Sequence, residues 1–198
     1  MYNKDMSGQF SIQMVSCNNL DDEGFIEWLF SPAMLFGSHD KWWGGTGGRD
    51  TPHEGLDICR YRTSDGAIGY LGAGALVPVI YEGRIVHVID DFLGKSVFVV
   101  HDKESRDGDR LFTIYSHITP RNCVRPGKTL NAGDYVGTIA DPLSKGRTVR
   151  PHLHISAARI TDTVTPGELD WSTINGNTGV TLVNPLGILD LPYSILEE

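Results

Sequence analysis

The chain has 198 residues, of which 40% are apolar and 21% charged, so it is long enough for one globular domain with a proper hydrophobic core. Its formal net charge is -8 and its pI is near 5.3, and it has no Lys/Arg-rich tract that could neutralise phosphates. These values argue against nucleic acid as a partner and against simple electrostatic adhesion to an anionic membrane or cell wall.

The first residues, 1–5, contain neither the basic nor the apolar region of an export signal. No stretch of the sequence approaches the length needed to span a bilayer, so we expect no transmembrane segment. The sequence as given is therefore expected to be cytoplasmic. Removal of an export signal would leave the same appearance and would place the protein in the periplasm or outside the cell. The sequence indicates no oligomeric state.

Residues 1–40 differ in character from the rest and are expected to form a partly helical N-terminal extension, with a β domain in residues 41–198. A helix is predicted within residues 20–36, where apolar residues recur at helical spacing: Phe25, Ile26, Trp28 and Leu29. Pro32 should end or kink that helix. Such an extension could lie across a groove of the β domain and regulate it.

A glycine-rich loop with two large aromatics, Trp42 and Trp43, precedes a histidine at position 53. The loop has two interpretations, which the sequence leaves open. It is either a surface loop anchored by its tryptophans or the aromatic wall of a cleft beside His53.

The three cysteines, Cys17, Cys59 and Cys123, are widely spaced and odd in number, so at most one disulfide could form. No CxxC pair offers a thiolate metal site. Cys59 could share a face with Asp57, but we interpret it as a buried structural thiol, because free cysteine commonly behaves as a small hydrophobic residue.

Short β-branched runs separated by Gly, Asp, Asn and Pro dominate the sequence from residue 67 onward. The predicted strands are residues 75–80, 83–89, 96–100, 111–118, 135–139 and 152–160. This pattern predicts a mainly β fold, an antiparallel sheet or sandwich. There is no βαβ alternation and no dinucleotide-binding or P-loop fingerprint.

Two clusters of possible metal ligands stand far apart in the sequence. His53 and Asp57 are four residues apart, and His152 and His154 alternate within an apolar, strand-like run. Alternation on a strand projects the latter two to the same side, about 6.5 to 7 Å apart. Two histidines and one carboxylate are enough protein ligands for a catalytic zinc with an open position. Spacing alone does not tell which member of the second pair binds the metal.

His117, near the end of a predicted strand, is the fifth candidate for the site. Water bound to zinc becomes acidic enough to supply hydroxide near neutral pH, and an uncoordinated histidine beside it can move a proton or stabilise an oxyanion. We interpret the remaining histidines as structural or exposed: His39, His87 and His101. The chain is therefore predicted to be a metalloenzyme.

The order HxxxD, then Tyr-x-His, then HxH resembles the lysostaphin/LytM-type zinc endopeptidases of bacterial peptidoglycan. The matching residues are His53 to Ile58, Ile114 to Ile118 and Pro151 to His154. Shorter pieces also fit the family: residues 74–79 with 82–86 as a hairpin, residues 124–137 as a V-x-x-G-x-x-L-x-x-G-D-x-V-G stretch, and the Asn-Pro of residues 184–185. The resemblance spans about residues 40 to 190.

The resemblance implies zinc ligation by His53, Asp57 and His154, and catalytic roles for His117 and His152 in orienting the water and supporting the tetrahedral intermediate. It also implies a compact antiparallel β domain, described as a duplicated hybrid motif, and a peptide or peptidoglycan substrate.

Two departures from the family pattern are expected to border the substrate groove. Residues 141–150 replace a Gly-Ser-Thr-Gly-like turn, and the usual HLHFE becomes His152 to Ser156, without the acidic residue. Both are expected to change substrate preference more than metal binding.

Three other interpretations compete with a zinc hydrolase. A non-catalytic domain of the same fold could use the groove to bind or activate a partner. A non-haem iron enzyme also uses two histidines and a carboxylate, but it would leave His117 and His152 without a role. A cupin would need a further ligand downstream, and no histidine follows His154.

Overall fold

The structure is a computed structural model that describes residues 9–44, 47–106, 108–189 and 191–196. The fold is mainly β, as the sequence predicts. The strands are β1 Phe25–Phe30, β2 Gly55–Ile58, β3 Arg60–Thr63, β4 Ile68–Tyr70, β5 Leu76–Pro78, β6 Gly83–Asp90, β7 Lys95–Arg106, β8 Asp109–Pro120, β9 Thr129–Leu130, β10 Tyr135–Ile139, β11 Leu153–Thr161, β12 Val180–Val183 and β13 Tyr193–Ile195. The helices are α1 Gln9–Cys17, α2 Trp171–Gly176 and α3 Leu186–Leu189, with 3-10 turns η1 Pro32–Met34, η2 Pro142–Lys145 and η3 Pro166–Glu168.

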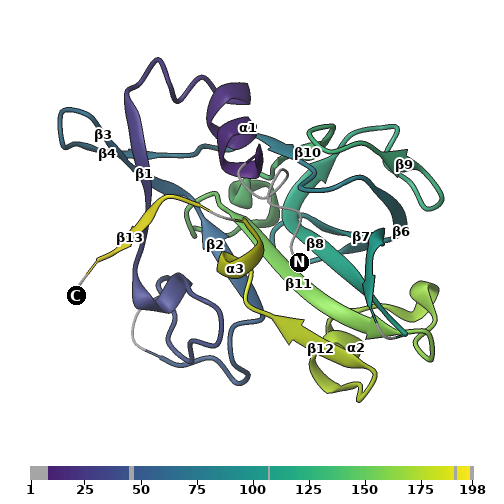
Figure 1. Cartoon of the computed structure of the whole chain (residues 1–198). Coiled ribbons are helices and arrows are strands. Elements are labelled where there is room, and N and C mark those ends of the chain that lie inside the picture. The colour runs from purple at the N-terminus through teal and green to yellow at the C-terminus, as the bar shows by residue number, and fades with distance from the viewer. Residues whose placement is uncertain (1–8, 45–46, 107, 190, 197–198) are drawn as a thin grey trace.

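A nine-stranded sheet in the order β12-β11-β8-β7-β6-β9 carries the site, with β2, β5 and β10 paired off this path (Figure 1). Its pairs are antiparallel. β11 pairs with β2 over residues 153–156 and with β8 over residues 154–161, so two distant parts of the sequence meet on either side of it. This arrangement places the second histidine cluster next to the first.

The central strands are buried on both faces. Along β7, Val97 and Val99 belong to one apolar cluster, whereas Phe98 and Val100 belong to the other. Successive side chains of a strand point to opposite faces, so each cluster covers one side of the sheet. On β11, Ala158 and Ile160 lie on the side of the second cluster. Every second residue of a strand shares a face, so His154, four residues before Ala158, lies on that same side.

A smaller sheet joins the two ends of the chain in the order β13-β1-β3-β4. β13 runs parallel to β1, and β3 runs antiparallel to it (Figure 1). Within the expected extension, residues 25–30 are therefore sheet partners of strands from later in the chain. The predicted boundary near residue 40 stays a prediction.

The prediction of a helix within residues 20–36 is wrong, because β1 lies in that segment. The N-terminal helix is α1 Gln9–Cys17 instead. The apolar run Phe25 to Phe30 is only six residues long and rich in aromatics, and such short runs fit either period. The preceding Gly24 has φ +76, which a helix could not accommodate. Phe10 and Met14 of α1 are fully buried in the core, and no described residue of segment 9–40 lines the cavity at the histidines.

All three cysteines are free thiols, and Cys59 is buried, as expected. No helix among the described residues is both long and apolar enough to cross a membrane.

Candidate metal centre

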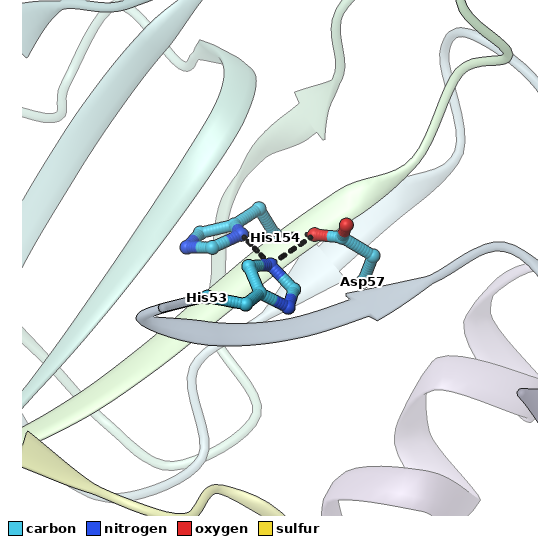
Figure 2. A group of neighbouring side chains, drawn as sticks. All are labelled: His53, Asp57 and His154. Atoms are coloured by element: carbon cyan, nitrogen blue, oxygen red, sulfur yellow. Dashed lines mark hydrogen bonds and ion pairs between the residues drawn. The ribbon is translucent and has the colours of Figure 1, made fainter. Parts of the chain in front are cut away.

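Three of the predicted site residues meet in one buried cluster. The Nε2 atom of His53 lies 3.2 Å from Oδ1 of Asp57 and 3.1 Å from Nδ1 of His154. Nδ1 of His154 lies 2.9 Å from the same Asp57 oxygen. Figure 2 shows the three side chains pointing toward one another, and each is at most 6% exposed. One nitrogen from each imidazole and one carboxylate oxygen therefore face a common point.

Strand pairing brings these residues together. Asp57 of β2 is the direct partner of His154 of β11, so their side chains stand on the same face. A side chain at Gly55 would collide with the backbone oxygen of Ile155 and with the His154 ring. Glycine at this position therefore lets β2 approach β11 closely enough for the cluster to form.

The cluster fits a zinc ion in its donor set and spacing. Zinc favours imidazole nitrogen and carboxylate oxygen, and tetrahedral bonds of about 2.0 to 2.2 Å separate neighbouring ligand atoms by about 3.3 to 3.5 Å. The separations in the cluster, 2.9 to 3.2 Å, are close to this spacing. His53, Asp57 and His154 also form a possible metal site by the proximity of their ligand atoms alone.

Each member of the cluster has its other polar atom held by a neighbour. Nδ1 of His53 donates to the backbone oxygen of Leu35 at 3.0 Å, which leaves Nε2 free for a metal. Nε1 of Trp42 donates to Oδ2 of Asp57 at 2.7 Å, which leaves Oδ1 free. The ligand atoms are thus oriented before a metal arrives.

Ser156 holds the third ligand, and the expectation for this position was wrong. Its hydroxyl lies 2.9 Å from Nε2 of His154 and is fully buried, so it orients the ligand and does not border a groove. Two strand positions after His154, it shares that residue's face of the sheet. The missing acidic residue therefore concerns the metal ligand, not the substrate.

His117 reaches the cluster through a bulge in β8. Ile118 pairs with Lys95 and Tyr115 with Val97, so two residues of β8 oppose the single Ser96 of β7. His117 has φ +61, a left-handed conformation that few non-glycine residues adopt. Because Tyr115 and Ile118 both pack into the same apolar cluster, the residues between them turn to the other face. The His117 ring centroid lies 4.9 Å from that of His152 and 5.6 Å from that of His154.

Asp91, which sequence reasoning missed, fixes the orientation of His117. Its Oδ1 accepts from Nδ1 of His117 at 3.1 Å, and its Oδ2 accepts from the His117 backbone N–H at 2.9 Å. Ser96 and the amides of Leu93 and Gly94 also donate to this carboxylate. Nε2 is therefore the ring nitrogen of His117 that Asp91 leaves available.

His152 is the second uncoordinated histidine beside the cluster. Its Nδ1 donates to the backbone oxygen of Arg150 at 2.8 Å, and its Nε2 lies 3.9 Å from Oδ1 of Asp57. The ring packs edge-on against Trp42 with centroids 4.9 Å apart. Because Nδ1 carries the proton of the neutral ring, Nε2 of His152 is a proton acceptor that faces the cluster of His53, Asp57 and His154.

The family model of peptidase family M23 matches residues 52–166, which is more than half of the chain and includes all five site residues. The chain belongs to peptidase family M23. Among curated proteins, no relative matches it.

Solved structures of M23 proteins resemble the chain at low sequence identity. The solution structure of lysostaphin is 20% identical over 88% of this chain and 59% of that one, with a TM-score of 0.49. The catalytic domain of EnpA, a prophage-encoded M23 protein from Enterococcus faecalis, is 20% identical over 78% of this chain and 90% of that domain, with a TM-score of 0.42. The chain thus spans 59% of the length of lysostaphin.

The electrostatics of this M23 site favour the protonation states that a metal needs. Burial opposes a charge on Asp57, but the neighbouring His53 and His152 and the hydrogen bonds from the cluster outweigh burial and hold its pKa well below the usual range. Burial lowers the pKa of His154, and it lowers that of His152 to about 4. An ionised carboxylate and neutral imidazoles are the forms that bind a metal.

The site opens into a cavity of about 250 Å³, here called the metal cavity. Its lining residues are Trp43, Arg49, His53, Glu54, Asp57, Asp91, Phe92, His117, His152, His154 and Trp171. Trp43 stacks on Phe92 at a centroid distance of 5.8 Å. Of the two interpretations of the tryptophan loop, the aromatic wall of a cleft is the one that this geometry favours. Gly45 and Thr46 of that loop lie outside the described residues.

The other histidines stand apart from this cavity, as expected. His39 is exposed and His87 half-buried, and neither lines the metal cavity. His101 is buried, with Nδ1 3.0 Å from the backbone oxygen of Glu82 and Nε2 2.7 Å from the hydroxyl of Thr113. These contacts give it a structural role.

Proposed function

We propose that this M23 peptidase is a zinc-dependent endopeptidase that hydrolyses peptide bonds in peptidoglycan stem peptides or cross-bridges. The observation that carries the proposal is the convergence of His53, Asp57 and His154 on one point, at tetrahedral spacing, beside two histidines that stay outside the cluster. A merely structural zinc site would have a fourth protein ligand. Here His53, Asp57 and His154 line a cavity of about 250 Å³, which would leave room for water and a peptide group.

When bound, zinc supplies Lewis acidity, which activates water and polarises a carbonyl. His152 is suited to take the proton of the attacking water, because its Nε2 carries no proton and faces the cluster. Burial keeps this ring neutral by lowering its pKa to about 4. In the proposed mechanism His152 is the general base.

His117 is suited to the oxyanion that develops at the scissile carbonyl. Asp91 holds its Nδ1, so Nε2 can present a hydrogen to the substrate when the ring is protonated. Arg49 lies 3.6 Å from Oδ2 of Asp57 and shares the lining of the cavity, where it helps to hold that ligand in place.

Metal content and peptidoglycan cleavage, measured on one preparation each, test the proposal. The wild type, His152→Ala and the exposed control His39→Ala are each expected to bind near-stoichiometric zinc. Only His152→Ala should lose most of its cleavage, because it removes the base and leaves all three ligands.

Three results would contradict the proposal. Wild-type turnover by His152→Ala would overturn the assignment of roles. Zinc without cleavage of any wall type would favour a domain that binds or activates a partner. Iron in place of zinc would favour the non-haem iron enzyme.

A further inference from the structure

A second cavity of about 750 Å³ adjoins the metal cavity, and Trp43 and Phe92 line both. We call it the arginine pocket. It lies between the tryptophan loop, the small sheet and the segment that follows η2. Its volume is within the range of ligand-binding clefts, so it could hold several residues of a peptide whose scissile bond lies in the metal cavity.

Three arginines line this pocket without an acidic partner: Arg60, Arg147 and Arg150. None of them forms an ion pair within the described part of the chain, and no described acidic side chain lines the pocket. Other arginines of this acidic protein do pair, such as Arg62 with Glu27 at 2.9 Å. A concentration of unpaired positive charge in a chain of net charge -8 is therefore a local property of the pocket.

Aromatic side chains hold two of these guanidinium groups in place. Arg150 lies 3.8 Å from the ring centroid of Tyr70, and Arg147 lies 4.6 Å from that of Phe92. A guanidinium that packs over an aromatic ring is partly ordered in advance, and its N–H groups remain available at its edge. Those edges match the geometry of a carboxylate.

Arg60 brings the third charge from the pocket floor. It is half-buried, and its Nε has no hydrogen-bond partner among the described residues. Arg60 and Arg150 line the pocket together with the buried Cys59. Arg60 therefore adds positive charge to the pocket, although its buried Nε is not accessible to a ligand.

We propose that the arginine pocket binds side-chain carboxylates of the peptide substrate, so that this enzyme selects acidic peptides over neutral glycine bridges. The proposal rests on the proposed function, because it places the carboxylate beside the bond that the metal cavity would hydrolyse. The segment that follows η2, which carries Arg147 and Arg150, would then determine substrate preference.

Direct binding tests the pocket separately from catalysis. The probes are an N-acetylated, C-amidated peptide with two glutamates and the matched peptide with two glutamines, titrated into the purified full chain and followed calorimetrically. The wild type should bind the glutamate peptide at least about tenfold more tightly, since a hydrogen bond to a charged group contributes about 1.5 to 3 kcal/mol. The double variant Arg147→Gln/Arg150→Gln should abolish this preference. Both side chains are exposed, so the fold should tolerate it.

The matched control is Arg125→Gln, which removes the same charge from an exposed site outside both cavities and should keep the preference. Equal affinity of the wild type for both peptides, or no measurable binding of the glutamate peptide, would overturn the proposal. Tighter binding of inorganic pyrophosphate than of the glutamate peptide would overturn it as well, in favour of a phosphate ligand. Preferential binding of the glutamate peptide by a protein that cleaves no peptidoglycan would support the pocket while contradicting the peptidase activity.

Discussion

The metal cavity and the arginine pocket share Trp43 and Phe92 but differ in how their polar groups are partnered. Around the metal cluster, every ligand has its second polar atom bound, by Leu35, Trp42 or Ser156. In the arginine pocket, two of the three guanidinium groups pack over aromatic rings, and none has a carboxylate partner among the described residues.

This difference separates fixed geometry from binding capacity. Buried groups that already have all their partners can be held rigidly, which suits chemistry that depends on positions within fractions of an ångström. Exposed charges without partners can gain them from a ligand. Substitutions at the cluster should therefore change metal content or kcat, whereas substitutions in the pocket should change binding and KM.

The largest effect is expected from His154→Ala. It removes one of three ligands, so zinc content should fall to background and cleavage should fall at least about 10³-fold. Atomic absorption and peptidoglycan turnover on the same sample check both. Stoichiometric zinc in this variant would mean that the cluster is not the metal site.

Asp91→Asn should reduce kcat about 10- to 100-fold, because an amide fixes His117 less well than a carboxylate does. Zinc content and KM should stay near the wild-type values, since Asp91 touches no ligand of the cluster. An equal rise in KM and fall in kcat would argue that the variant disturbs substrate binding instead.

Trp42→Phe should weaken zinc affinity about tenfold, because it removes the hydrogen bond to Oδ2 of Asp57 and keeps the aromatic wall. Competition with a chromogenic chelator measures the change. Trp43→Phe is the matched control, and an equal loss of affinity there would assign the effect to packing.

The smallest effect on activity is expected from a substitution of His101, which lines neither cavity and affects the pH dependence of stability instead. Burial lowers the pKa of His101 to about 4, although Asp102 opposes the shift. Between the ordinary pKa of 6.5 and about 4, the unfolded chain binds a proton that the folded chain does not, so this residue's contribution to stability falls as the pH falls. It is constant above that window.

In that pH window, the contribution of His101 to the free energy of unfolding is expected to change by about 1.4 kcal/mol per pH unit. The free energy of unfolding, measured by denaturant titration of the metal-free protein, should therefore fall between pH 7 and pH 5 by about 2 kcal/mol more in the wild type than in His101→Gln. Equal losses in the two proteins would show that His101 does not titrate in this window.

The sequence was sufficient to predict the strands that consist of a clear run of β-branched residues. The predicted strand at 135–139 is β10, and the ends of β6, β8 and β11 lie within two residues of the predicted ends. The residues of HxxxD and HxH come close together because Asp57 of β2 pairs with His154 of β11, and His53 and His152 stand just before these two strands. β12 and β13, by contrast, have neither the length nor the alternation to stand out.

Contacts that depend on tertiary geometry could not be read from the sequence. Asp91 lies 26 residues before His117 in an ordinary polar turn, and only the bulge in β8 brings the two together. The three arginines of the second pocket come from two distant segments, β3 and the run that follows η2, so no motif joins them. The prediction of a helix within residues 20–36 fails because the sheet partners of β1, strands β3 and β13, lie far along the chain.

The contacts of Asp91 link the stability of a turn to the readiness of the site. One carboxylate closes the turn between β6 and β7 through the amides of Leu93 and Gly94 and also holds the ring and backbone of His117. Local opening of that hairpin would release the ring at the same moment. The hydrogen-exchange rates of those two amides would therefore report how often the site loses this arrangement, without any substrate present.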